Sequence, residues 1–220
     1  MKNKLKLIVP FLAGCAMLNA CSTASPTAYT GLSSTALLQP SRHDKGGRVP
    51  LSYRRENVDW RQYKKIIVEP VIVYDGADNQ FVNVKEEDRQ ALADYMRDAF
   101  TEELGKRFTI TDTPAPDALR LQLTLTGAKL TSPVIGTLSH FDMAGGVYNA
   151  VQAGRGREGS MTGSVSYAAE VFESENDTLL LAFVAKQYPA AMNVGATFSS
   201  LSASRVGIDN AARDLGDRLN

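Results

Sequence analysis

Hydrophobic and polar residues alternate or recur at helical spacing over most of the chain. Leucine and polar residues alternate without a break over Leu119–Thr126, which predicts a strand with one buried face. The same alternation predicts a strand over Met161–Phe172 and, after a polar turn, a partner strand over Thr178–Gln187. Apolar residues spaced three and four apart predict amphipathic helices over Lys85–Arg107 and Ser200–Leu219.

Two further segments complete the predicted sheet. Lys64–Tyr74 is an almost continuous β-branched run, and Pro70 within it predicts a bulge or a break in pairing because proline has no N–H. Phe108–Thr111 predicts a short strand, and Trp60, the only tryptophan, is expected to cover the core before the first strand. We therefore expect an α+β fold, with a mostly antiparallel sheet of about five strands and two amphipathic helices packed on one face.

The ends of the first helix carry their own signals. Asn83 and Glu86 have the spacing of a weak capping box at its start. Lys106 and Arg107 are expected in its last turn, where positive charge complements the helix dipole.

A glycine-rich segment, residues 127–159, separates the two halves of the predicted sheet. Its apolar residues follow neither the alternation of a strand nor the three-and-four spacing of a helix. A short helix over Ser139–Ala153 is an alternative. Such a long connection without regular structure is uncommon inside a domain, so we expect it to face a partner. The candidate partner-facing residues are Val134, Ile135, Leu138, Phe141, Met143, Val147 and Tyr148.

The N-terminus has the pattern of a secretory signal. A basic start precedes an apolar run over Leu7–Leu18, and the sequence Leu18-Asn19-Ala20-Cys21 is followed at once by polar residues. Leucine three positions before a cysteine, with alanine just before it, is typical of a lipoprotein signal. We therefore expect a signal peptide over residues 1–20 and lipid attachment at Cys21.

A second cysteine offers an alternative acceptor. Leu12-Ala13-Gly14-Cys15 is the better match as a motif, but cutting before Cys15 leaves an apolar run of only six residues. Cys21 is therefore favoured. The apolar run is too short to span a bilayer, which needs roughly twenty residues, so acylated Cys21 is expected to provide the contact with the membrane.

The expected mature chain has a tether over residues 21–30 and a single periplasmic domain over residues 31–220. Ser22 follows the acceptor cysteine, whereas aspartate there is the usual signal for retention in the inner membrane of enteric-type bacteria. This sorting rule predicts an outer-membrane lipoprotein that faces the periplasm.

Composition excludes several kinds of partner and site. Lysine and arginine total 24 against 24 aspartate and glutamate, and removal of residues 1–20 leaves a slight negative excess, so nucleic acid is not an expected partner. Both cysteines lie in the signal region, which excludes a thiol site or disulfide in the domain. Arg42, Lys45 and Arg48 make one loop basic; we expect a solvated loop, with contact to anionic lipid or glycan as the alternative.

The sequence offers little catalytic chemistry. The only histidines are His43 and His140, and neither lies in a metal-binding or hydrolase motif. Residues 154–160 are rich in glycine but lack the G-K-[ST] ending of a phosphate loop. We expect a non-enzymatic protein without a metal or cofactor that binds a protein or envelope component. The alternative is a domain that carries a lipid or small ligand between the sheet and the glycine-rich segment.

Four short motifs together resemble a known family. They are Tyr29-Thr30-Gly31-Leu32, Val58-Asp59-Trp60 with Tyr63, Val68-Glu69-Pro70-Val71, and Phe108-Thr109-Ile110 with Pro116-Asp117-Ala118-Leu119. In this order behind a lipoprotein signal, they resemble the bacterial lipoproteins of the domain of unknown function 3313, over about Tyr29–Leu219. The resemblance implies an envelope lipoprotein and assigns no activity or catalytic residue.

Overall fold

The computed structural model describes residues 27–41, 44, 47–130, 163–189 and 201–220. In these ranges the chain forms one sheet, one short 3₁₀ turn and two long helices. In chain order they are β1 (Gln39–Pro40), β2 (Leu51–Arg54), η1 (Trp60–Gln62), β3 (Lys65–Val68), β4 (Ile72–Val73), β5 (Gln80–Val82), α1 (Glu86–Leu104), β6 (Thr109–Ile110), β7 (Ala118–Lys129), β8 (Ser164–Glu173), β9 (Leu179–Gln187) and α4 (Ser202–Arg218).

The α+β class is confirmed, but the sheet is mixed and has nine described strands. Its order is β1-β2-β9-β8-β7-β3-β6, with β4 and β5 also paired to β7. The pairs β1–β2, β2–β9, β9–β8 and β8–β7 are antiparallel. β3, β4 and β5 all run parallel to β7, and β6 runs parallel to β3. The prediction of a mostly antiparallel sheet of about five strands is therefore wrong in both number and direction.

The connection through α1 explains the parallel pairs. The chain leaves β3, β4 and β5, crosses the sheet as α1, and returns through β6 and β7 in the original direction. A helical crossover is the usual way to join parallel strands. β3, β4 and β5 follow one another along a single edge of β7, and Glu69–Val71 interrupts the series. The break predicted at Pro70 is confirmed.

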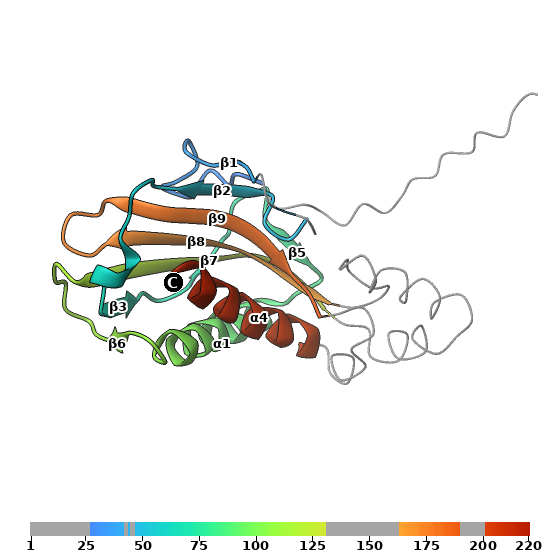
Figure 1. The fold of residues 1–220 in the computed structure, drawn as a ribbon. Coiled ribbons are helices and arrows are strands. Elements are labelled where there is room, and N and C mark those ends of the chain that lie inside the picture. Colours follow the sequence, from blue (N-terminus) through green and yellow to red (C-terminus); the bar gives the residue numbers. More distant parts are fainter. Residues whose placement is uncertain (1–26, 42–43, 45–46, 131–162, 190–200) are drawn as a thin grey trace, which may run out of the picture.

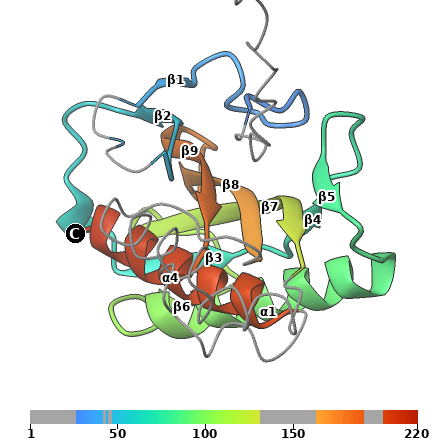
Figure 2. The same cartoon turned by 90° about the vertical axis from the view of Figure 1, so that its right-hand side faces the viewer.

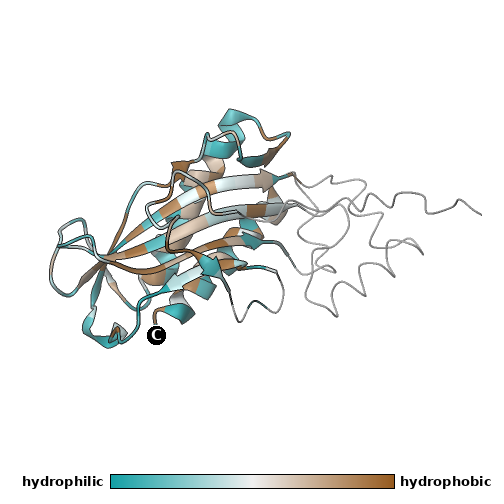
Figure 3. Ribbon diagram, turned by 90° about the horizontal axis from the view of Figure 1, so that it is seen from above, coloured by the Kyte–Doolittle hydropathy of each residue, from teal (hydrophilic) through white to brown (hydrophobic). Residues whose placement is uncertain are grey.

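Both helices lie on one face of the sheet, as predicted (Figures 1 and 2). The strands show alternating hydrophilic and hydrophobic bands, as expected where successive side chains point to opposite faces (Figure 3). Large buried side chains from both helices and from the three central strands share one core. They include Leu92, Met96, Phe100, Leu121, Leu123, Tyr167, Phe183, Ile208 and Leu215. Trp60 is also buried in this core, as predicted from its position before the first predicted strand.

The ends of α1 differ from the sequence prediction. Lys85 is the N-cap residue and makes no side-chain capping bond, while Asn83 adopts a left-handed backbone with φ of 55°. The helix ends at Leu104, so Lys106 and Arg107 follow the last turn. Arg107 instead donates to the backbone oxygen of Trp60 at 3.3 Å and stacks over Phe108. The predicted capping box and basic last turn are therefore wrong.

Candidate functional site

The residues singled out by the sequence lie mostly outside the described ranges. These residues are Cys15, Cys21, His43, His140 and the partner-facing set from Val134 to Tyr148. The helix left open over Ser139–Ala153 also lies outside them, as does most of the groove expected beside the glycine-rich segment. The described residues form two other surface features: a segment bound to the helix-free face of the sheet and a groove between the helices.

Residues 27–38, here called the strap, lie on the face of the sheet opposite the helices (Figures 1 and 2). Tyr29 is fully buried, and its ring packs edge-on against Tyr74 with 5.2 Å between the centroids. Leu32 is also buried, with Ala168 and Val184 in the same small apolar cluster. The folded body therefore begins earlier than residue 31, and part of the segment expected to be a tether is packed against the sheet.

Glu170 fixes the strap to β8. This side chain is 5% exposed, and its Oε1 accepts a hydrogen bond from Ser33 Oγ at 2.8 Å and from the Ser34 backbone N–H at 2.7 Å. Hydrogen bonds to a charged group are stronger than neutral ones. One buried carboxylate thus satisfies two donors of the strap and determines where the segment lies.

The face under and around the strap is more polar than the core face. Thr124, Thr126, Ser166 and Glu170 are all buried on it. Burial also raises the pKa of Tyr29, since ionising a phenol away from water is unfavourable. On this face, the hydrogen bonds from Ser33 and Ser34 to Glu170 therefore act beside the apolar packing of Tyr29 and Leu32.

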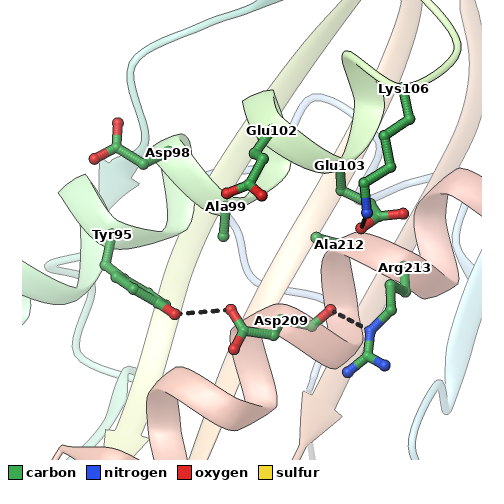
Figure 4. A pocket seen from close by; sticks show the side chains of 9 residues that line it. All are labelled: Tyr95, Asp98, Ala99, Glu102, Glu103, Lys106, Asp209, Ala212 and Arg213. Carbon is green, nitrogen blue, oxygen red and sulfur yellow. Dashed lines mark hydrogen bonds and ion pairs between the residues drawn. The ribbon is translucent and has the colours of Figure 1, made fainter.

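An open groove of about 470 Å³ runs between α1 and α4 (Figure 4). On one side, Tyr95 Oη donates to Asp209 Oδ1 at 2.9 Å and so links the two helices. Burial, and then the hydrogen bond to Asp209, raise the pKa of Tyr95. At the other end, Lys106 Nζ and Glu103 Oε2 form an ion pair at 2.6 Å.

Carboxylates outnumber cationic side chains in the lining of the groove. Its charged lining residues are Asp98, Glu102, Glu103, Asp209, Lys106 and Arg213. Asp98 and Glu102 lie one turn apart on α1 and are exposed, and neither pairs with a cation among the described residues. Such a surface can attract a cationic group, but it places no nucleophile beside a base.

Among the described residues we also looked for groups of metal ligands and for membrane-spanning helices. Within them, no three histidine, cysteine, aspartate or glutamate side chains are grouped so that they could hold a metal ion. Neither described helix combines the length and the apolar character needed to cross a bilayer.

Neither surface feature is predicted from the sequence, although each has a signal in it. Tyr29-Thr30-Gly31-Leu32 is a motif, but serine, threonine and alanine before it favour a tether over residues 21–30. Asp94, Asp98 and Glu102 recur every four residues on α1, a spacing that marks one face of a helix. The pairing of that face with α4 could not be inferred from either helix alone.

Comparison with known proteins gives one family and several distant structures. The family model described as a protein of unknown function (DUF3313) matches residues 28–215. A search of curated proteins gives no match.

Three solved structures illustrate the structural similarity. The PelC dodecamer from Paraburkholderia phytofirmans is 8% identical, with a TM-score of 0.37 over 76% of this chain and 91% of that chain. A DUF330 protein from Xanthomonas campestris is 10% identical, with a TM-score of 0.40 over 76% and 90%. A DUF4136 protein from Bacteroides thetaiotaomicron is 11% identical, with a TM-score of 0.38 over 77% and 95%. These scores are too low to transfer a function.

Proposed function

Since this chain belongs to the DUF3313 family of proteins of unknown function, we propose a role from its own residues. We propose that it is a non-enzymatic lipoprotein of the bacterial outer membrane, anchored through Cys21, whose periplasmic domain binds a protein or another envelope component.

The position of Cys21 relative to the folded body carries this proposal. The cysteine ends a lipoprotein signal, and the described body begins six residues later at Thr27. Six residues span at most about 20 Å when fully extended. A lipid on Cys21 would therefore hold the domain close to a bilayer. Stable anchoring requires two or more acyl chains, because one chain binds only weakly.

Two observations support a binding role rather than catalysis. The glycine-rich segment carries apolar residues without a regular period, including Phe141, Val147 and Tyr148. The groove between α1 and α4 presents the exposed carboxylates Asp98 and Glu102 but no described nucleophile–base pair. The composition of the segment and the lining of the groove are better suited to contact than to covalent chemistry.

The anchor is tested by Cys21→Ser and Cys15→Ser in the full chain, made singly and together. We expect only Cys21→Ser to release the protein from membranes, and we expect the N-terminal peptide of the wild type to carry the mass of attached acyl chains. Sedimentation and mass spectrometry measure the two results. An unmodified N-terminal residue, or a double variant that still sediments with membranes, would overturn the proposal.

The assignment to the outer membrane is tested separately by the substitution Ser22→Asp. This substitution should move the lipoprotein to the inner membrane in an enteric-type host, whereas Ser22→Thr should not. Density-gradient fractionation of the two variants measures the distribution. If the wild type already fractionates with the inner membrane, the outer-membrane assignment is wrong.

Binding is tested by deleting residues 134–156 and repeating a cross-linking capture from intact cells. We expect the deletion to remove specific partners while the protein remains folded and anchored. An unchanged set of cross-linked partners would exclude this segment as the interface.

A further inference from the structure

The strap forms its backbone hydrogen bonds with itself rather than with the sheet. Among the described residues, the backbone-to-backbone bonds of the strap all lie within it, for example the bond from the Leu32 N–H to the Tyr29 oxygen. The strap forms no ladder with a described strand, and strand pairing begins only with β1. Its turns therefore do not need the sheet to satisfy the backbone.

Among the described residues, the polar contacts between the strap and the sheet side converge on two side chains. Glu170 accepts hydrogen bonds from Ser33 Oγ and from the Ser34 N–H. Thr30 Oγ1 lies 3.4 Å from Tyr74 Oη. Because the body contributes side chains to these contacts, they can break without disturbing the ladder between two strands.

The apolar contacts of the strap form a cluster separate from the main core. Tyr29 and Leu32 pack with Tyr74, Ala168 and Val184 on the helix-free face of the sheet. The main core lies between the sheet and the two helices, and it contains no buried residue of the strap. Release of the strap would therefore leave the main core closed.

Buried hydroxyls without a partner weaken the attachment of the strap. Tyr29 Oη, Ser34 Oγ and Thr126 Oγ1 are buried in the strap or on the face around it, and none has a hydrogen-bond partner among the described residues. Such a group regains favourable interactions when water reaches it. A released strap also regains conformational entropy. Both effects reduce the free energy that holds the strap in place.

We propose that the strap is a releasable link, so that the domain is held at either of two distances from the membrane. The inference rests on the lipid anchor proposed above, because the strap lies between Cys21 and the sheet. With the strap bound, the six residues from Cys21 to Thr27 span at most about 20 Å. With the strap released, the eighteen residues from Cys21 to Gln39 span at most about 60 Å.

The two positions of the strap give the domain two ranges of reach. In the bound position, the domain contacts components next to the bilayer. In the released position, it reaches components up to about three times as far away without leaving the membrane. Segments that open locally while the core stays folded are drawn from the weakly held parts of a structure, and the strap has that character.

Two adjacent alanines of β8 allow opening of the strap to be measured separately from unfolding. Ala168 packs with the strap, Ala169 lies in the main core, and both are buried. Ala168→Cys and Ala169→Cys are therefore matched variants of the full lipidated chain. A water-soluble maleimide labels each new thiol only when its surroundings open, and peptide mass spectrometry measures the rate.

We expect the thiol of Ala168→Cys to be labelled at least about tenfold faster than that of Ala169→Cys, because opening of the strap alone exposes only the first. Adding Ile208→Val weakens the main core and should speed labelling of Ala169→Cys at least about twofold. The same addition should leave labelling of Ala168→Cys unchanged, since the core stays folded when the strap opens.

The change in distance is measured by neutron reflectometry of the lipidated protein on a supported bilayer of phosphatidylethanolamine with phosphatidylglycerol. Tyr29→Ser with Leu32→Ser removes the apolar contacts of the strap and should release it. Leu37→Ser is the control, because Leu37 lies in the same segment but is 45% exposed. We expect only the first variant to widen the mean gap between bilayer and domain, by about 10 Å for a flexible link.

Equal labelling rates at the two alanine positions, or equal acceleration of both by Ile208→Val, would show that the strap opens only when the whole domain unfolds and would overturn the proposal. An unchanged gap in the Tyr29→Ser, Leu32→Ser variant would also overturn it. The mass of the N-terminal peptide in the same samples reports the anchor independently. An unmodified N-terminus with faster labelling of Ala168→Cys would disprove the anchor, and with it the change of distance, but not release of the strap.

Discussion

At Gly127 the chain has room for a hydrogen atom but not for a methyl group. A Cβ there would lie 2.6 Å from both Cβ and the backbone oxygen of Gln80, because β5 passes directly beside a bulge in β7. Gly216 in α4 is the opposite case, since the nearest atom to an added Cβ is Glu103 Cγ at 4.0 Å. The same substitution should therefore have opposite effects at these two glycines.

We expect Gly127→Ala to reduce the free energy of unfolding by about 1–3 kcal/mol, because β5 must move away from β7. We expect Gly216→Ala to raise it by up to about 1 kcal/mol, because alanine favours a helix and meets no obstacle. Urea unfolding of both variants beside the wild type measures the difference. An unchanged or raised free energy of unfolding in Gly127→Ala would contradict the close approach at Gly127.

The buried Tyr63 makes the free energy of unfolding depend on pH. Burial, and then the hydrogen bond from its hydroxyl to Glu173, raise the pKa of Tyr63 to about 12. The folded state therefore holds this proton more tightly than the unfolded state, in which the pKa is near 10. The stability that depends on the proton is complete below pH 10 and is lost as the pH rises toward 12.

Tyr63→Phe removes the ionisable group and should make the loss of stability between pH 10 and 12 shallower. Urea unfolding at several pH values compares the variant with the wild type, and the other buried tyrosines contribute equally to both. Parallel curves for the two proteins would show that Tyr63 does not contribute to the loss.

At the scale of elements, long periodic segments were predicted well, and the short strands β3, β4 and β6 lie within predicted segments, whereas β1, β2 and β5 were not predicted. The predicted strands at β7, β8 and β9 and the two helices all exist near the predicted residues. β1 and β2 have two and four residues, too few to show a period, and β2 depends on a partner far along the chain. The direction of β3 depends on the crossover through α1, which hydrophobic alternation does not report.

One side chain of β8, Glu170, makes polar contacts that help to attach the strap. In a Glu170→Ala variant, the Ser34 backbone N–H would lose its acceptor, so we expect a loss of about 1–3 kcal/mol in the free energy of unfolding. Glu175→Ala, in the exposed turn before β9, should change it by less than about 0.5 kcal/mol. Chemical unfolding measures both, and faster hydrogen exchange at Ser34 should accompany only the first. Equal losses would show that Glu170 does not hold the strap.

At the scale of the molecule, the sequence leads to a proposal for an anchor but not to the surfaces of the domain. A signal peptide is local, so Cys21 can be proposed from adjacent residues alone. Residues 27–30 of the strap were predicted to be tether because their composition is typical of flexible linkers. The burial of Tyr29 depends on Tyr74 and Val184, which are distant in sequence. The groove between α1 and α4 likewise requires knowledge of how two helices pack.

Two shortened chains test whether the strap belongs to the body. A chain that begins at Thr27 should unfold at the same temperature as one that begins at Cys21. A chain that begins at Gln39 loses the buried Tyr29 and Leu32, which should cost roughly 3–6 kcal/mol in total. Thermal unfolding followed by circular dichroism compares the three. If the chain from Gln39 were as stable as the others, the strap would not contribute to the stability of the fold.

The pairing of β2 with β9 has a consequence for how an exported chain folds. The strand at residues 51–54 hydrogen-bonds to residues 181–184, and its only other described strand partner is the two-residue β1. A chain that crosses a membrane N-terminus first therefore exposes residues 27–54 before residues 181–184 have arrived. The sheet can close only near the end of export.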